Sequence, residues 1–118
     1  MAHFDNPLQL LDSFAGATSG YPFGPGALVY KVGGKMFALV ADDVEPFRIS
    51  LKCEPDLALE LRALYPGAVS AGYHLNKRHW NTIEMNDTLP KAELEEWISH
   101  SYDLVVAGLP RRQRETLR

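Results

Sequence analysis

The feature that most constrains the fold is a pair of β-type runs separated by Gly33-Gly34. Residues 27–32 read Ala-Leu-Val-Tyr-Lys-Val, and residues 35–40 read Lys-Met-Phe-Ala-Leu-Val. β-Branched and aromatic residues favour strands, and glycine admits the positive φ angles that tight hairpin turns require. The sequence therefore predicts an antiparallel hairpin in which Val32 is opposite Lys35.

Alternating and helical patterns predict the remaining elements. Phe47, Ile49 and Leu51 alternate with polar residues, which is the period-2 pattern of a strand with one buried face. Pro55 and Pro66-Gly67 are typical of the beginning of one helix and of the stop that follows it. The expected elements, in chain order, are a helix capped by Asp5 or Asn6, strands at 27–32, 35–40 and 47–52, a helix from Pro55, strands at 69–75 and 80–85, a helix from about Pro90 and a short helix near 110–117.

This order of elements predicts an α+β fold. Three strands, a helix and two further strands, with a helix at each end, give a five-stranded, mainly antiparallel sheet with helices packed on one face. The whole chain, residues 1–118, is expected to form a single domain, with a core at about 5–108 and a basic C-terminal tail at 109–118. The opposite face of the sheet is then uncovered.

The cysteine count and the hydropathy of the chain predict the cellular compartment of such a domain. Cys53 is the only cysteine, so no intrachain disulfide can form and a reducing compartment is expected. The first residues lack the cationic and apolar regions of a signal peptide, and no apolar run approaches the roughly 18 residues that span a bilayer. We therefore expect a cytoplasmic protein that does not contact a membrane, and no motif implies a cofactor.

Side-chain alternation predicts what the uncovered face carries. In the hairpin, the bulky residues are expected to share the inward face. The residues expected to point inward are Leu28, Tyr30, Phe37 and Leu39. The residues expected to point outward are Val29, Lys31, Met36, Ala38, Arg48, Ser50, Lys52, Trp80, Thr82 and Glu84. An uncovered face that mixes cations with an indole and a thioether suits a binding partner.

The densest group of polar and aromatic side chains lies where the last two strands meet. A turn that only joins strands is usually Asn-Gly or Asp-Gly, whereas residues 72–83 carry two histidines, two cations, two asparagines and a tryptophan. Cations bind phosphates through counterion release, and aromatic rings stack on bases. The candidate nucleic-acid or anion site comprises His74, Asn76, Lys77, Arg78, His79 and Trp80, with Lys31, Lys35, Arg48 and Lys52 in support. The alternatives are another ligand or partner, and a solvated turn in which Asn76 and Asn81 satisfy local backbone groups.

Other patterns favour structural roles. His74 and His79 fit no zinc spacing, and we expect no metal site. Cys53, beside Lys52, is expected to be a small buried side chain rather than a reactive thiolate. Gly33-Gly34 joins strand to strand and is therefore no nucleotide-binding loop. No nucleophile motif or pair of catalytic carboxylates is found, so we expect no enzymatic activity.

Four blocks of the sequence resemble the MmcQ/YjbR-like family. They are Val-Tyr-Lys-Val-Gly-Gly-Lys-Met-Phe-Ala at 29–38, Ile-Ser-Leu-Lys-Cys at 49–53, Gly-Tyr-His-Leu-Asn-Lys-Arg-His-Trp-Asn at 72–81 and Ser-Tyr-Asp-Leu-Val at 101–105. The resemblance covers about residues 20–117 and implies a two-layer fold of order α-β3-α-β2-α, in the type III secretion-chaperone-like class. It also implies DNA binding, which is proposed for members from a pair of protruding hairpins, and it brings no catalytic residues.

We therefore expect a non-enzymatic DNA-binding module that uses two cationic hairpins, at 31–35 and 76–80. The net charge of −3 indicates a targeted contact rather than general coating of DNA. The main alternative is a protein-interaction or chaperone-like module that binds a partner, or a second copy as a homodimer, through the uncovered sheet face. A third alternative, an enzyme or small-ligand binder built on the 74–79 turn, requires a concave pocket there.

Overall fold

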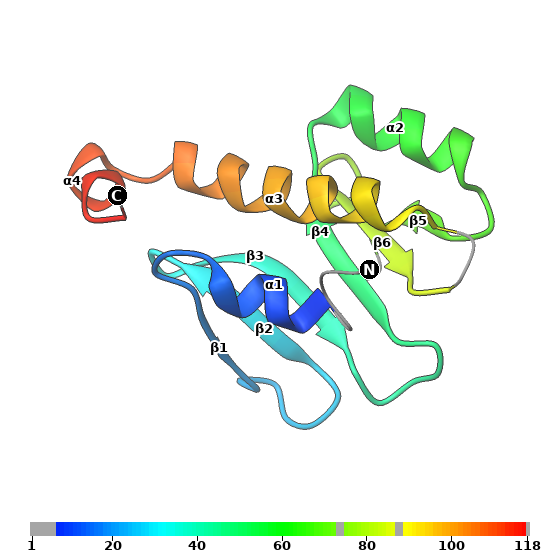
Figure 1. The fold of residues 1–118 in the computed structure, drawn as a ribbon, viewed down its shortest axis with the longest axis horizontal. Helices are drawn as coiled ribbons and strands as arrows, with labels where there is room; N and C mark the ends of the chain where they lie inside the picture. The colour runs from blue at the N-terminus through cyan, green and yellow to red at the C-terminus, as the bar shows by residue number, and fades with distance from the viewer. Residues whose placement is uncertain (1–6, 73–74, 87–88, 118) are drawn as a thin grey trace.

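The computed structural model describes residues 7–72, 75–86 and 89–117, in which helices lie over a single sheet (Figure 1). The helices are α1 (Pro7–Ser13), α2 (Pro55–Leu64), α3 (Lys91–Ala107) and α4 (Arg111–Glu115). The strands are β1 (Thr18–Gly20), β2 (Leu28–Val32), β3 (Lys35–Ala41), β4 (Arg48–Lys52), β5 (Val69–Ala71) and β6 (Trp80–Glu84). Among the described residues, no helix is both long enough and apolar enough to cross a membrane.

The described strands form a six-stranded sheet in the order β1-β2-β3-β4-β6-β5, and every neighbouring pair is antiparallel. The prediction of five strands is therefore wrong by one. The additional strand, β1, pairs Thr18 with Lys31 and Gly20 with Val29 at the edge of the sheet. Sequence alternation did not reveal it because Thr-Ser-Gly is short and contains no large apolar side chain.

The helices α1, α2 and α3 bury apolar side chains against one side of the sheet (Figure 1). Phe37 and Ile49 of the sheet are fully buried there, together with Leu11 of α1, Ala58 of α2 and Ile98 of α3. Burying a large apolar side chain in this way contributes roughly 1.5–3 kcal/mol. The predicted α+β class, with an antiparallel sheet and helices, is confirmed.

A β-bulge in β3 changes which side chains face the core. The extra residue is Phe37: it and Ala38 are both fully buried. Leu39 pairs with Val29, which is buried but outside the core cluster, on the side of the sheet away from the described helices, which we call the uncovered face. The predicted outward position of Ala38 and the predicted inward position of Leu39 are therefore wrong. Strict alternation fails here because a bulge places two residues of one strand opposite one residue of its neighbour.

A buried serine fills the gap that the bulge opens between β3 and β4. The last regular pair of these strands at this end is Ala38 with Leu51. Beyond that pair, the Ser101 hydroxyl of α3 donates to the Phe37 carbonyl at 2.6 Å and accepts from the Lys52 amide at 2.8 Å. Ser101 is completely buried. The hydroxyl thus replaces a direct bond between the strands and fixes α3 against this end of the sheet.

The turn between β2 and β3 is Gly33-Gly34, with Val32 opposite Lys35 as the sequence predicted. Both glycines have a positive φ, 59° at Gly33 and 79° at Gly34, which is the conformation that tight hairpin turns require. A Cβ atom at Gly33 would lie 2.7 Å from both methyl carbons of Leu109. This turn is therefore packed closely against the segment that leads into α4.

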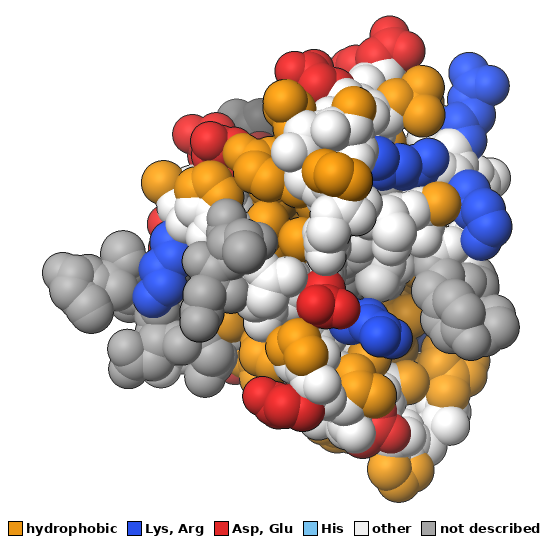
Figure 2. Space-filling model, turned by 90° about the vertical axis from the view of Figure 1, so that its right-hand side faces the viewer, with side chains coloured by type: hydrophobic (Ala, Val, Ile, Leu, Met, Phe, Trp, Pro, Cys, Tyr) orange, Lys and Arg blue, Asp and Glu red, His pale blue; other side chains and the backbone are white. Residues whose placement is uncertain are grey.

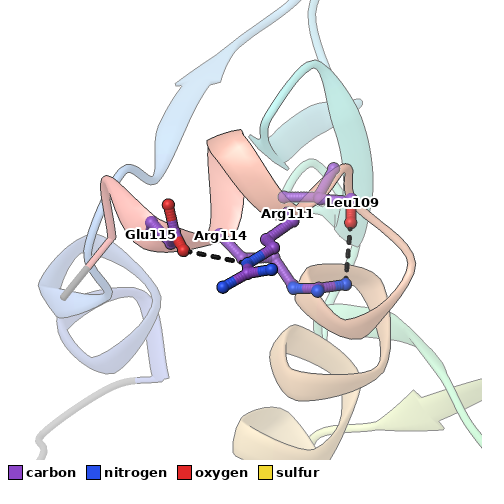
Figure 3. A network of polar contacts seen from close by, with 4 residues as sticks. All are labelled: Leu109, Arg111, Arg114 and Glu115. Atoms are coloured by element: carbon purple, nitrogen blue, oxygen red, sulfur yellow. Dashed lines mark hydrogen bonds and ion pairs between the residues drawn. The ribbon is translucent and has the colours of Figure 1, made fainter.

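The short helix α4 lies beside this turn and has polar contacts of its own. Arg111 Nε lies 3.1 Å from Glu115 Oε2, one helical turn later, and Arg114 Nη1 donates to the Leu109 carbonyl at 3.1 Å (Figure 3). Leu117, just beyond the helix, packs against the core. The short helix predicted near 110–117 is thus present as Arg111–Glu115, within the segment expected to be a basic tail.

Candidate functional site

The sheet topology brings the two predicted cationic turns to the same end of the sheet. β3 begins after the 33–34 turn, and β6 begins after the 76–79 segment. Since β3 and β6 both run antiparallel to β4, the two strands start at the same end of the sheet. Lys52, the last residue of β4, is opposite Trp80 at that end. We call the group Lys31, Lys35, Lys52, Lys77, Arg78 and Trp80 the cationic end.

Local hydrogen bonds build the 76–79 turn. The Asn76 side-chain oxygen accepts the amide of Arg78 at 2.9 Å, and the Asn76 carbonyl accepts the amide of His79 at 3.2 Å. The His79 carbonyl in turn accepts the amide of Cys53 at 2.8 Å, which continues the pairing of β6 with β4. Asn76 therefore shapes the turn, as asparagine commonly does, while Lys77 and Arg78 are exposed to solvent.

Arg62, near the end of α2, holds this turn from the helix side of the sheet. Its Nε donates to Asn81 Oδ1 at 2.7 Å, and its Nη2 donates to the carbonyls of Lys77 and Trp80. Asn81 is 2% exposed, and its own amide group donates to the Ala58 carbonyl at 3.2 Å. A planar guanidinium suits this set of contacts better than an ammonium group does. Sequence reasoning assigned no role to Arg62, because nothing local links a helix end to a turn so far along the chain.

Two of the predicted contact residues are restrained by Gly72. The Lys77 ammonium donates to the Gly72 carbonyl at 3.0 Å, which uses one of its three protons. A Cβ atom at Gly72 would lie 2.7 Å from the Cβ of Trp80, so the two segments approach each other closely. Trp80 itself is only partly buried. The indole is thus held in position with part of its surface in solvent.

The structure separates Arg48 from the other predicted cations. Arg48 begins β4 and is opposite Glu84, whereas Lys52 ends the same strand. Four residues of strand place them about 13 Å apart. Arg48 and Glu84 line an open depression of about 230 Å³ together with Ser70 and Thr82. Arg48 therefore lies at the other end of the face, beside a carboxylate.

Among the described residues, no carboxylate forms an ion pair with a cation of the cationic end. Figure 2 views the side of the molecule that carries α2, β5 and β6, away from the β2–β3 turn, and on this side Lys and Arg side chains gather at the upper right. Asp and Glu side chains are spread over the top, left and lower parts of this view. In the described parts of the chain, Arg111 and Glu115 form an ion pair, and the five cations of the cationic end form none. Cations without an ion pair keep their attraction for an anionic ligand.

The remaining candidate residues, two histidines and a cysteine, do not form a reactive or metal-binding group in the described structure. His74 lies outside the described residues, and His79 is partly buried. Burial raises the pKa of the Cys53 thiol to about 11, and the Glu54 carboxylate acts in the same direction. A thiol that is protonated at neutral pH is a poor nucleophile. Within the described ranges, no three His, Cys, Asp or Glu side chains lie together as metal ligands would.

Comparison with known proteins identifies relatives of this chain. The family model described as YjbR matches residues 12–104. The uncharacterised protein YbdF of Escherichia coli O157:H7 is 38% identical over 99 residues, which are 83% of this chain and 80% of YbdF. The uncharacterised protein YjbR of Escherichia coli strain K12 is 34% identical over 87 residues, which are 74% of this chain and 73% of YjbR.

Two solved structures share the fold. The Deinococcus radiodurans protein DR2400 superposes with a TM-score of 0.87 at 36% identity, covering 93% of this chain and 84% of DR2400. A Pseudomonas syringae protein superposes with a TM-score of 0.67 at 26% identity, covering 84% of this chain and 97% of that protein. Both matches support the α+β architecture described above.

Proposed function

The chain belongs to the YjbR family, and we propose that it is a non-enzymatic module that binds nucleic acid at the cationic end of its sheet. The observation that supports the proposal is that two turns, far apart in sequence, lie at the same end of the sheet as Lys52. Five cations that form no ion pair within the described residues lie there beside a partly exposed indole. Such a surface attracts phosphates and offers a ring on which a base can stack.

The charges set the expected strength of binding. Each phosphate contact contributes a slope of about −0.9 to log K against log salt concentration for duplex DNA. Lys77 already donates one proton to Gly72, and the net charge of the chain is −3. Both features weaken the attraction for a polyanion. We therefore expect a Kd on the order of 10⁻⁴–10⁻⁶ M at physiological salt, the range of non-specific binding.

Fluorescence anisotropy of a labelled DNA oligonucleotide over a series of salt concentrations tests the proposal. The double variant Lys77→Ala/Arg78→Ala should flatten the salt dependence by about two units of slope. Lys91→Ala is the matched control, because Lys91 is exposed at the start of α3, away from the uncovered face, and its loss should leave the slope unchanged. An unchanged slope in the double variant excludes these two residues as phosphate contacts. Failure of the wild-type protein to bind at about 50 mM salt refutes the proposed function.

A protein partner on the uncovered face is a second candidate, favoured by an apolar loop at its edge. Tyr21 and Phe23 follow β1 and are 48% and 77% exposed. Tyr21 lines a depression together with Val29 and Lys31 of β2. A chaperone-like module or a homodimer would use such a surface. Light scattering at low and high salt, with and without DNA, separates the candidates, since a salt-insensitive dimer that ignores DNA supports the protein partner.

A further inference from the structure

One row of side chains crosses the uncovered face at the cationic end. Trp80 of β6 is opposite Lys52 of β4, and Met36 of β3 is opposite Lys31 of β2. Residues paired across antiparallel strands place their side chains on the same face. Both pairs lie on the uncovered face, since the residues that alternate with them point into the core. We call Trp80, Lys52, Met36 and Lys31 the indole–lysine row.

The row alternates apolar and cationic groups over a span that suits a polymer rather than a single ion. Trp80, Lys52 and Met36 are partly exposed, and Lys31 is exposed. With neighbouring strands about 4.8 Å apart, Lys52 lies about 10 Å from Lys31, and Trp80 lies about 14 Å from it. An unpaired nucleic-acid strand offers the complementary pattern, in which bases with apolar faces accompany a line of phosphates.

The two turns beside the row are held against the body of the protein. The Gly33-Gly34 turn packs against Leu109, and the 76–79 turn is tied to α2 by the Arg62 guanidinium. Neither turn is thus free to extend into a groove. A duplex also hides its base faces inside the stack and offers phosphates and groove edges. The partly exposed indole and thioether of the row therefore gain little from a duplex, whereas they can pack against an unpaired base.

We infer that the indole–lysine row binds single-stranded nucleic acid in preference to duplex. Trp80 stacks on an unpaired base, Met36 packs beside the strand, and Lys31 and Lys52 contact its phosphates. This inference rests on the proposed function of the same site and adds the form of nucleic acid that the site takes.

Anisotropy of fluorescein-labelled DNA of about 12 nucleotides, single-stranded and as the matching duplex, tests the inference with the intact protein at about 50 mM salt. We expect the single strand to bind about 10-fold more tightly than the duplex, because a stacked base adds affinity that a duplex does not. Trp80→Ala should weaken single-strand binding about 10-fold and leave duplex binding unchanged. Trp80→Phe should retain part of the preference, since phenylalanine also stacks.

A charge-matched pair keeps the test valid if Trp80→Ala does not fold. Met36→Glu places a carboxylate inside the row, whereas Leu59→Glu places one on α2, where Leu59 is 61% exposed. Both variants change the net charge equally, so only Met36→Glu should weaken single-strand binding, by about 10-fold. Equal effects of the two variants, or equal affinities of wild type for single strand and duplex, overturn the inference while the proposed function stands. If wild type binds neither DNA, both the inference and the proposed function fail.

Discussion

Replacing Arg62 by methionine should destabilise the protein, although Arg62 lies outside the core cluster. The guanidinium donates to Asn81 Oδ1 at 2.7 Å and to two carbonyls of the turn that leads into β6. Asn81 is 2% exposed, so water cannot replace the lost donor. Methionine keeps much of the length and apolar stem of arginine but donates no hydrogen bond.

The expected loss in the free energy of unfolding is about 2–4 kcal/mol. A hydrogen bond to a charged group is worth about 1.5–3 kcal/mol, and a buried acceptor without a donor adds its desolvation cost. The carbonyls of Lys77 and Trp80 are nearer to solvent and should add little, because water can bind them. Arg62→Lys should recover only part of the loss, since an ammonium lacks the planar fork.

Urea unfolding measures this loss, with an unchanged m-value expected if the native fold is kept. Arg111→Met is the matched control: the Arg111 side chain is 83% exposed and its ion pair with Glu115 is a surface pair, so no resolved change is expected. Hydrogen exchange at the Gly72 amide, which donates to the Trp80 carbonyl, should quicken in Arg62→Met beyond the change in global stability. A loss below about 0.5 kcal/mol would show that the guanidinium does not hold the turn.

Three further perturbations follow from other parts of the structure. Ser101→Ala leaves the buried Phe37 carbonyl and the partly buried Lys52 amide without their partner and should lower the free energy of unfolding in urea by about 2–4 kcal/mol. Ser99→Ala, on the same helix, removes neither bond and should cause no such loss. Gly33→Ala should lower the free energy of unfolding more than Gly34→Ala does, because both glycines have positive φ but only a Cβ atom at Gly33 would contact Leu109. Equal unfolding midpoints of the two variants would contradict the close packing of Gly33 against Leu109. Burial raises the pKa of Cys53 from 9.0 to about 11, so the thiol loses its proton at lower pH in the unfolded chain than in the folded protein. The stability that the neutral thiol contributes is therefore complete below about pH 9 and is lost as the pH rises through about 11. Urea midpoints at about pH 8 and about pH 10 should therefore fall less in Cys53→Val than in wild type, and an equal fall in both proteins would contradict the assignment.

The sequence by itself determined one hairpin, the alternation of one strand and the fold class of this protein. Gly33-Gly34 between two β-type runs predicted the hairpin and the pairing of Val32 with Lys35, because turn conformation depends on the residues in the turn. Alternation in β4 placed Arg48, Ser50 and Lys52 on one face, because successive side chains of a strand point to opposite sides. The order of these local elements was also sufficient for the α+β class.

Only the tertiary structure decided which distant residues meet. The bulge at Phe37 and the bridge made by Ser101 depend on how α3 packs across β3 and β4, and no periodicity in either strand encodes that contact. Strand pairing likewise placed Lys52 opposite Trp80 and Arg48 opposite Glu84. The docking of α2 brought Arg62 within hydrogen-bonding distance of the turn at Lys77. The physical reason is that strand pairing and helix docking are set by burial and hydrogen bonding between segments far apart in sequence, whereas a sequence pattern reports each segment alone.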